Sequence, residues 1–160
     1  MRFRNAIADD LSQIYALERL PEFRTFVGSW SMDHHLKTFA DPGAAYIVAE
    51  DAQKQIAAFA ILQGLQSEHR AIELKRLVVG VPDQGLGRKL LSAVADRAFG
   101  EYSAHRLFLD VFETNDRACH VYETFGFRKE GIMRDAFYRD GIYHSLVLMS
   151  LLDNEYGANS

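Results

Sequence analysis

The sequence predicts a mixed α/β domain in which helices pack on a sheet. Three observations predict this class. Apolar runs of strand length recur along the chain, segments with helical periodicity lie between them, and Asp140-Gly141 indicates a hairpin near the C-terminus. A chain of 160 residues is long enough to bury a substantial core, so we expect one domain over residues 1–160.

The first third of the chain is expected to begin with an edge strand within residues 1–7. Asp9 or Asp10 can then cap a helix that turns Leu11 and Ile14 inward. A second helix is predicted over residues 31–39, before a turn at 41–43, and two strands follow, over residues 44–49 and 56–62.

Residues 21–33, between the two predicted helices, are irregular and rich in aromatic side chains. Phe23 and Trp30 either form a pocket for an acceptor molecule or pack beneath the sheet, and both interpretations stay open. We expect His34 and His35 on the exposed side of the second helix. The six histidines lack the spacing of a metal site, so no catalytic metal is predicted.

The second half alternates strands and helices. A long strand is predicted over residues 71–79, followed by a turn that contains Gly85 and Gly87 and then an amphipathic helix. The remaining elements are a strand over residues 106–111, a helix over 115–125, and two strands on either side of the turn at 139–141.

The glycine turn can hold a phosphate group. Glycine lets the main chain approach a ligand closely, and the first N–H groups of the helix attract an anion. Leu90 stands where a dinucleotide-binding motif has its third glycine, and Arg88-Lys89 follow Gly87 where a nucleotide-triphosphate loop has Lys-Ser/Thr. These differences argue against a nicotinamide enzyme and an ATPase. From this segment alone, a tight turn is as good an interpretation as a ligand site.

Two motifs together resemble the GNAT superfamily of acyl-CoA-dependent N-acetyltransferases. They follow the family's order, and they consist of Gln84-Gly85-Leu86-Gly87-Arg88 and of Asn115, Ala118, Tyr122, Gly126 and Phe127. The resemblance implies a twisted, mostly antiparallel sheet whose central parallel strands splay apart. It extends from about residue 71 to 152, and residues 130–141 resemble the branch of the ribosomal-protein N-terminal acetyltransferases.

The resemblance also implies where acetyl-CoA, the co-substrate, would bind. The pantetheine arm would lie beside Leu77, Val78 and Val79, and the side-chain amide of Asn115 would orient it. The pyrophosphate would bind at the glycine turn, to the main-chain N–H groups near Gln84, Gly85, Leu86, Gly87, Arg88 and Lys89.

Direct acyl transfer from sulfur to nitrogen needs a proton donor for the thiolate and an amine that has lost its proton. Tyr122 is the candidate acid, because a phenol is matched to an alkyl thiol. Glu73 is the favoured base, although strand alternation could instead pair it at the surface with Lys75 or Arg76. Weaker candidates for the base are Glu18, Glu68 and His144.

The resulting hypothesis is an enzyme that acetylates a primary amine, on a protein N-terminus or a small molecule, without an acyl-enzyme. The alternative is a CoA-binding regulatory module without turnover.

A net charge of −4 disfavours nucleic acid as a partner, and no apolar run approaches the ~20 residues of a membrane span. The single cysteine, Cys119, fits a cytoplasmic location. Residues 132–138 and 143–151 could form a homodimer interface.

Overall fold

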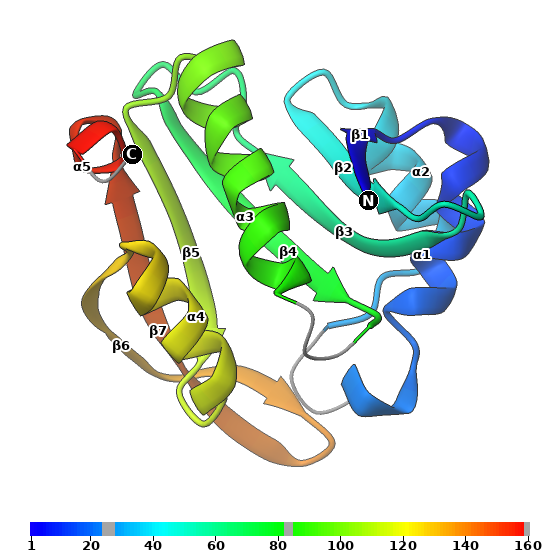
Figure 1. Ribbon diagram of the computed structural model, residues 1–160. Coiled ribbons are helices and arrows are strands. Elements are labelled where there is room, and N and C mark those ends of the chain that lie inside the picture. Colours follow the sequence, from blue (N-terminus) through cyan, green and yellow to red (C-terminus); the bar gives the residue numbers. More distant parts are fainter. Residues whose placement is uncertain (24–27, 82–84, 159–160) are drawn as a thin grey trace.

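The computed structural model describes residues 1–23, 28–81 and 85–158. Within them, one seven-stranded sheet has the order β1-β2-β3-β4-β5-β7-β6. Neighbouring strands are antiparallel except for the central pair β4 and β5, which are parallel. The predicted fold class is confirmed (Figure 1). The strands are β1 (Arg2–Asn5), β2 (Ala44–Glu50), β3 (Ile56–Gln63), β4 (Ala71–Val79), β5 (Arg106–Phe112), β6 (Arg128–Arg139) and β7 (Ile142–Leu152).

Helices cover both faces of the sheet, and each strand serves both because successive side chains point to opposite sides. Ile47 and Ala60 pack toward α3 and α4, whereas Val48 and Phe59 pack toward α1 and α2 (Figure 1). The α-helices are α1 (Leu11–Leu17), α2 (Met32–Ala40), α3 (Leu86–Asp96), α4 (Asp116–Phe125) and α5 (Asp153–Ala158), and the shorter turns are η1 (Ala8–Asp10), η2 (Pro21–Phe23) and η3 (Arg97–Glu101).

Short polar side chains determine where α2 and α4 begin, and a glycine determines where α4 ends. The Ser31 hydroxyl accepts a hydrogen bond from His34 N at 3.1 Å, and the Asn115 side chain accepts one from Ala118 N at 3.2 Å. Each bond satisfies an N–H group that has no partner inside the helix. Gly126 ends α4 with φ 128°, which a glycine adopts without strain. The predictions for both helices are confirmed to within one residue.

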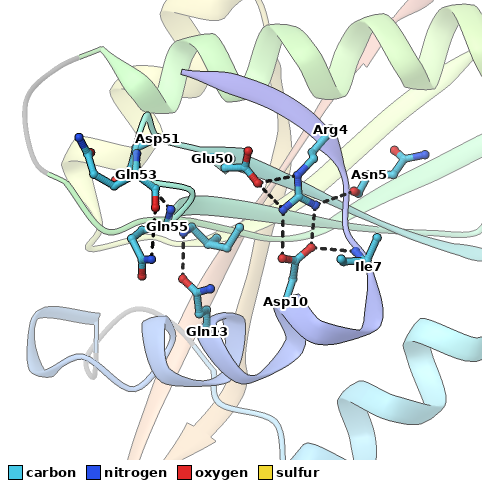
Figure 2. Close-up of polar contacts among 10 residues, drawn as sticks. Arg4, Asn5, Ile7, Asp10, Gln13, Glu50, Asp51, Gln53 and Gln55 are labelled. Atoms are coloured by element: carbon cyan, nitrogen blue, oxygen red, sulfur yellow. Dashed lines mark hydrogen bonds and ion pairs between the residues drawn. The ribbon is translucent and has the colours of Figure 1, made fainter.

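Asp10 does not cap α1 in the way the sequence predicted, because the turn η1 comes between the first strand and the helix. Its carboxylate accepts a hydrogen bond from Ile7 N at 2.8 Å and pairs with Arg4 at 2.7 Å (Figure 2). Arg4 also pairs with Glu50 at 2.7 Å. This ion cluster of Arg4, Asp10 and Glu50 therefore joins β1, η1 and β2.

The C-terminal hairpin forms as predicted. Asp140 and Gly141 have φ angles of 52° and 78°, which suit a tight turn between β6 and β7. Helix α5 was not predicted, and its Tyr156 ring stacks on Phe99 with the centroids 5.4 Å apart. None of the helices within the described ranges is long and apolar enough to cross a bilayer.

The parallel strands β4 and β5 pair only near their N-terminal ends. Their register comprises Ala71–Arg106, Ile72–Leu107 and Glu73–Phe108. Beyond Glu73, the described residues of the two strands do not pair, although β4 continues to Val79 and β5 to Phe112. The ribbons diverge in the same direction (Figure 1). The predicted splay of the central pair is therefore present.

Strand β4 also contains a bulge that its sequence pattern does not reveal. Leu62 on β3 lies opposite Leu74, but the next residue back, Ile61, lies opposite Arg76, so Lys75 is the extra residue. The bulge reverses which residues of β4, odd- or even-numbered, point their side chains to a given face of the sheet. Leu74 packs on the α3 side before it and Leu77 on the same side after it, which strict alternation would not allow.

Candidate active site

Helix α3 begins beside the diverging strands with free backbone donors. Gly85 precedes it with φ 67°, a left-handed conformation that favours glycine, and a Cβ built there would meet no atom within 4 Å. The first i to i−4 hydrogen bond of the helix runs from Lys89 N to Gly85 O at 3.1 Å. The N–H groups of Leu86, Gly87 and Arg88 therefore have no acceptor inside the helix.

These donors suit an anion such as a pyrophosphate, because they combine with the positive end of the helix dipole. A Cβ built on Gly87 would lie 3.6 Å from Val79 Cγ2, so the start of α3 lies against the end of β4. The side chains of Arg88 and Lys89 are exposed. The predicted contact at Gln84 lies outside the described residues.

The half of β4 beyond the bulge presents unpaired backbone groups toward β5. Gly80 N donates to Ala57 O on β3 at 2.8 Å. Because N–H directions alternate along a strand, the N–H groups of Leu77 and Val79 point away from β3, toward the gap. Val78 instead places its N–H toward β3, and its side chain is buried beneath α1 and α2. Leu77 and Val79 therefore provide an open strand edge to which an extended ligand with amide groups could bind.

Helix α4 carries the two remaining motif residues, with Asn115 as its N-cap and Tyr122 within it. The side-chain oxygen of Asn115 is used by the N-cap bond to Ala118, which leaves its NH₂ group to donate to a ligand. Tyr122 is buried and packs edge-to-face on Phe127, with the ring centroids 5.7 Å apart. Its hydroxyl has no hydrogen-bond partner among the described residues. Burial raises the pKa of Tyr122 well above its usual value, so the phenol keeps its proton at neutral pH.

Glu73 lies in the last paired position of β4, where the gap to β5 begins. It is half-buried, and burial raises the pKa of its carboxyl; Lys75 opposes this effect and Asp110 adds to it. The proposed surface pair with Arg76 is absent, because Arg76 binds Glu18 instead at 2.8 Å. A carboxylate with a raised pKa is a better proton acceptor, as a general base requires.

A buried polar network on the opposite face was missed by sequence reasoning. Glu18 binds His35 and Arg76, and the side chains of Glu18 and His35 have no exposed surface. The expectation that His35 is exposed is wrong, whereas His34 is exposed as expected. A signal was present. Glu18 follows Leu11 and Ile14 at positions i+7 and i+4, on the stripe of α1 that faces the core.

Trp30 and Phe23 were predicted to contact the acceptor molecule, and the structure describes the side chain of Trp30 alone. Trp30 packs partly buried against the core beneath α1 and α2, with His34 stacked on its ring at 3.8 Å between centroids. The backbone of Phe23 ends η2, but its side chain lies outside the described part of the chain. The acceptor role of both residues stays a prediction. Across the described ranges, no three His, Cys, Asp or Glu side chains gather as a metal site would require.

Residues 10–127 match the acetyltransferase (GNAT) family. The chain belongs to this family. The spermidine N(1)-acetyltransferase of Vibrio cholerae is 30% identical over 122 residues, which make up 75% of this chain and 70% of that protein. The spermidine N(1)-acetyltransferase of Escherichia coli K12 is 25% identical over 112 residues, which make up 69% and 59%.

A solved structure of the Vibrio cholerae spermidine N-acetyltransferase with CoA and spermine superimposes with a TM-score of 0.85. It is 26% identical and covers 97% of this chain and 96% of that chain. This GNAT protein is an acetyl-CoA-dependent N-acetyltransferase. The relatives give no support to the ribosomal-protein branch that residues 130–141 resemble.

Proposed function

We propose that this GNAT enzyme acetylates a primary amine on a small, polyamine-like molecule. The observation that carries the proposal is the gap in which β4 and β5 stop pairing beyond Glu73 and Phe108, next to the free N–H groups of α3. A strand-like arm with amide groups fits the open edge of β4, and its pyrophosphate fits the start of the helix. The relatives are spermidine N-acetyltransferases, which favours a small-molecule acceptor over a protein N-terminus.

Tyr122 and Glu73 are proposed to move the protons. The N–H groups of Leu77 and Val79 face the gap and can stabilise negative charge on a carbonyl oxygen placed there. Glu73 would accept a proton from the incoming ammonium group, directly or through water, since only a neutral amine attacks. Tyr122 would donate a hydrogen bond, and then a proton, to the departing thiolate.

The amine is proposed to attack the thioester directly. Cys119, one turn before Tyr122 on α4, is the sole cysteine of the chain. Burial raises the pKa of its thiol, with Lys129 opposing the shift. A thiol that keeps its proton at neutral pH is a poor nucleophile, so the site offers no reason for an acyl-enzyme on Cys119.

A thiol-release assay with acetyl-CoA tests the proposal. The panel should contain spermidine, spermine, simple diamines, amino acids and peptides with free N-termini. We expect the polyamines to give the highest kcat/KM. The highest kcat/KM on peptides would contradict the proposed acceptor, and a protein that binds acetyl-CoA but releases thiol with none of the amines would favour the regulatory module.

A further inference from the structure

The buried network on the α1 and α2 face takes no part in the chemistry proposed above, yet it joins four separate elements. We call it the Glu18 network. It consists of Glu18 after α1, Trp30 before α2, His35 on α2, Tyr46 on β2 and Arg76 on β4.

The Glu18 carboxylate is the centre of the network. Its Oε1 atom accepts from His35 Nε2 at 2.6 Å and from Trp30 N at 3.2 Å, and its Oε2 atom accepts from Arg76 Nη1 at 2.8 Å. Burial alone would raise the pKa of Glu18. The hydrogen bond from His35 and the charges of His35 and Arg76 outweigh it and hold the pKa below its usual value.

The histidine connects this carboxylate to the sheet. Its Nδ1 atom lies 2.7 Å from the Tyr46 hydroxyl. A carboxylate only accepts, so the proton on Nε2 points at Glu18, and the Tyr46 hydroxyl can either accept from Nδ1–H or donate to a bare Nδ1. Across the described residues, every fully buried side-chain nitrogen and oxygen has a partner. Such a network holds its members in one arrangement, since any change leaves a buried group unsatisfied.

Arg76 links the Glu18 network to β4, the strand that borders the gap. It directly follows the bulge residue Lys75 and directly precedes Leu77, whose N–H faces the gap. Its guanidinium lies 4.7 Å from the Trp30 ring centroid, and Nη2 would be 2.8 Å from a Cβ built on Gly28. Beyond Glu73, no described residue pairs with β4 on its β5 side. The position of this half of β4 therefore depends on β3, on the packing of α3 and on this anchor.

We propose that Glu18 is a positioning residue for acetyl transfer. It holds Arg76 and thereby fixes the unpaired half of β4 relative to the segment at residues 28–30. The N–H groups of Leu77 and Val79 and the acceptor side of the site then keep one relative position. The inference depends on the proposed function of the gap between β4 and β5.

The test compares Glu18→Gln with a matched control. Loss of one partner from a buried ion pair is destabilising wherever it occurs, so stability alone is not informative. Glu50→Gln breaks an arginine–carboxylate pair of similar length in the ion cluster of Arg4, Asp10 and Glu50, on β1 and β2 (Figure 2). Both variants are assayed well below their melting temperatures.

We expect Glu18→Gln to lower kcat by about 10–100-fold, the scale of a small misplacement of reacting groups. The KM for acetyl-CoA should rise by a smaller factor than kcat falls, because the arm loses alignment with β4 while the pyrophosphate keeps the N–H groups at the start of α3. Amide hydrogen exchange at Val78 and Gly80, whose N–H groups point toward β3, should be at least about tenfold faster than in Glu50→Gln. Glu50→Gln should keep the kcat of the wild type.

A double variant tests whether Glu18 acts through Arg76. If it does, Glu18→Gln combined with Arg76→Gln should be no slower than the slower single variant. Losses that multiply would overturn the proposal. So would a folded Glu18→Gln protein with wild-type kcat and wild-type exchange at Val78 and Gly80.

Two further measurements cover the cases in which Glu18→Gln does not fold or the wild type acetylates none of the amines. If Glu18→Gln does not fold, Tyr46→Phe removes only the hydroxyl at the end of the network. We then expect about a 3–10-fold loss of kcat with faster exchange at Val78 and Gly80. Wild-type values of both would overturn the proposal. If the wild type turns over no amine, the proposed function fails. Hydrogen exchange still decides whether Glu18 holds β4.

Discussion

Tyr122 and Glu73 are the two side chains on which the proposed chemistry depends, and they lie on different elements. Tyr122 is on α4 and Glu73 is on β4 at the end of its pairing with β5. Burial raises the pKa of both groups. The shifts favour a protonated donor at Tyr122 and a stronger base at Glu73, which is the division of roles that acetyl transfer requires.

Replacing Tyr122 by phenylalanine should separate turnover from folding. We expect kcat to fall by roughly 10²-fold, because the donor to the thiolate is lost. Stability should stay within about 0.5 kcal/mol, since the hydroxyl has no partner among the described residues to lose. Steady-state kinetics and thermal unfolding measure both. The control is Tyr156→Phe, which loses the hydrogen bond from Tyr156 to Asp96. It should keep the kcat of the wild type. Wild-type turnover in Tyr122→Phe would remove the residue from the mechanism.

Glu73 should impose an acid limb on the pH profile of kcat. Its folded pKa is raised, so the carboxylate is lost at a higher pH than for an ordinary glutamate, and activity should fall as the pH drops through that value. Glu73→Gln should lower kcat at neutral pH by about 10²–10⁴-fold and abolish this limb. The exposed Glu101→Gln serves as the control. A Glu73→Gln profile that keeps the same acid limb would assign the limb to another group.

At the level of single residues, the roles of Asn115 and Tyr122 stay predictions, whereas their element was predicted correctly. Short-range helix signals determine where α4 lies, with Asn115 as its cap and Tyr122 within it. His35 was misjudged because a polar side chain on a helix was assumed to face solvent. The apolar stripe of α1 indicates that Glu18 faces the core, but the pairs His35–Tyr46 and Glu18–Arg76 join residues far apart in sequence and leave no local pattern.

Among the elements, the start of α3 is the one most sensitive to a single methyl group. Gly85→Ala should cost about 1–2 kcal/mol, because φ 67° strains any residue with a Cβ. It should also raise the KM for acetyl-CoA, since relief of that strain moves the N–H groups of Leu86 and Gly87. Gly100→Ala, in open space within η3, should be neutral or stabilising. Equal KM values for the two variants would argue against a pyrophosphate at this helix.

The ion cluster that joins β1, η1 and β2 should make stability depend on pH. The hydrogen bond from Arg4 lowers the folded pKa of Asp10, although burial opposes it. A lowered folded pKa contributes stability that is present above the unfolded value, about 3.9, and is lost as the pH falls through the folded value. Asp10→Asn should therefore cost about 1–3 kcal/mol at pH 7 and progressively less below about pH 4. Urea unfolding at both pH values measures this, and a cost that does not change with pH would contradict it.

The sequence located the elements because apolar periodicity and caps are local signals. Strand β4 has the bounds that were predicted, residues 71–79, and the helix at Asn115 begins at its predicted cap. The bulge at Lys75 was not predictable, since it depends on how β3 pairs with β4. The turn η1 was missed for a related reason. Asp10 binds Arg4 and Ile7, and these contacts compete with a simple cap on α1.

For the whole molecule, the C-terminal hairpin is the surface most suited to a second copy. Ile132, Tyr138, Ile142 and Tyr143 are each more than half exposed on β6 and β7, at the edge of the sheet. We predict a homodimer through this face. Sedimentation equilibrium should give twice the chain mass of 18.2 kDa, and Ile142→Glu should shift it toward the monomer. A monomer mass at all concentrations would contradict the prediction.

The central claim is that β4 and β5 separate to receive acetyl-CoA. A crystal structure of the protein with CoA tests this claim most directly. We expect the pantetheine arm between Leu77–Val79 and β5, the pyrophosphate at the N–H groups of Leu86, Gly87 and Arg88, and the sulfur near the Tyr122 hydroxyl. CoA bound elsewhere, with β4 and β5 paired along their full length, would contradict the account.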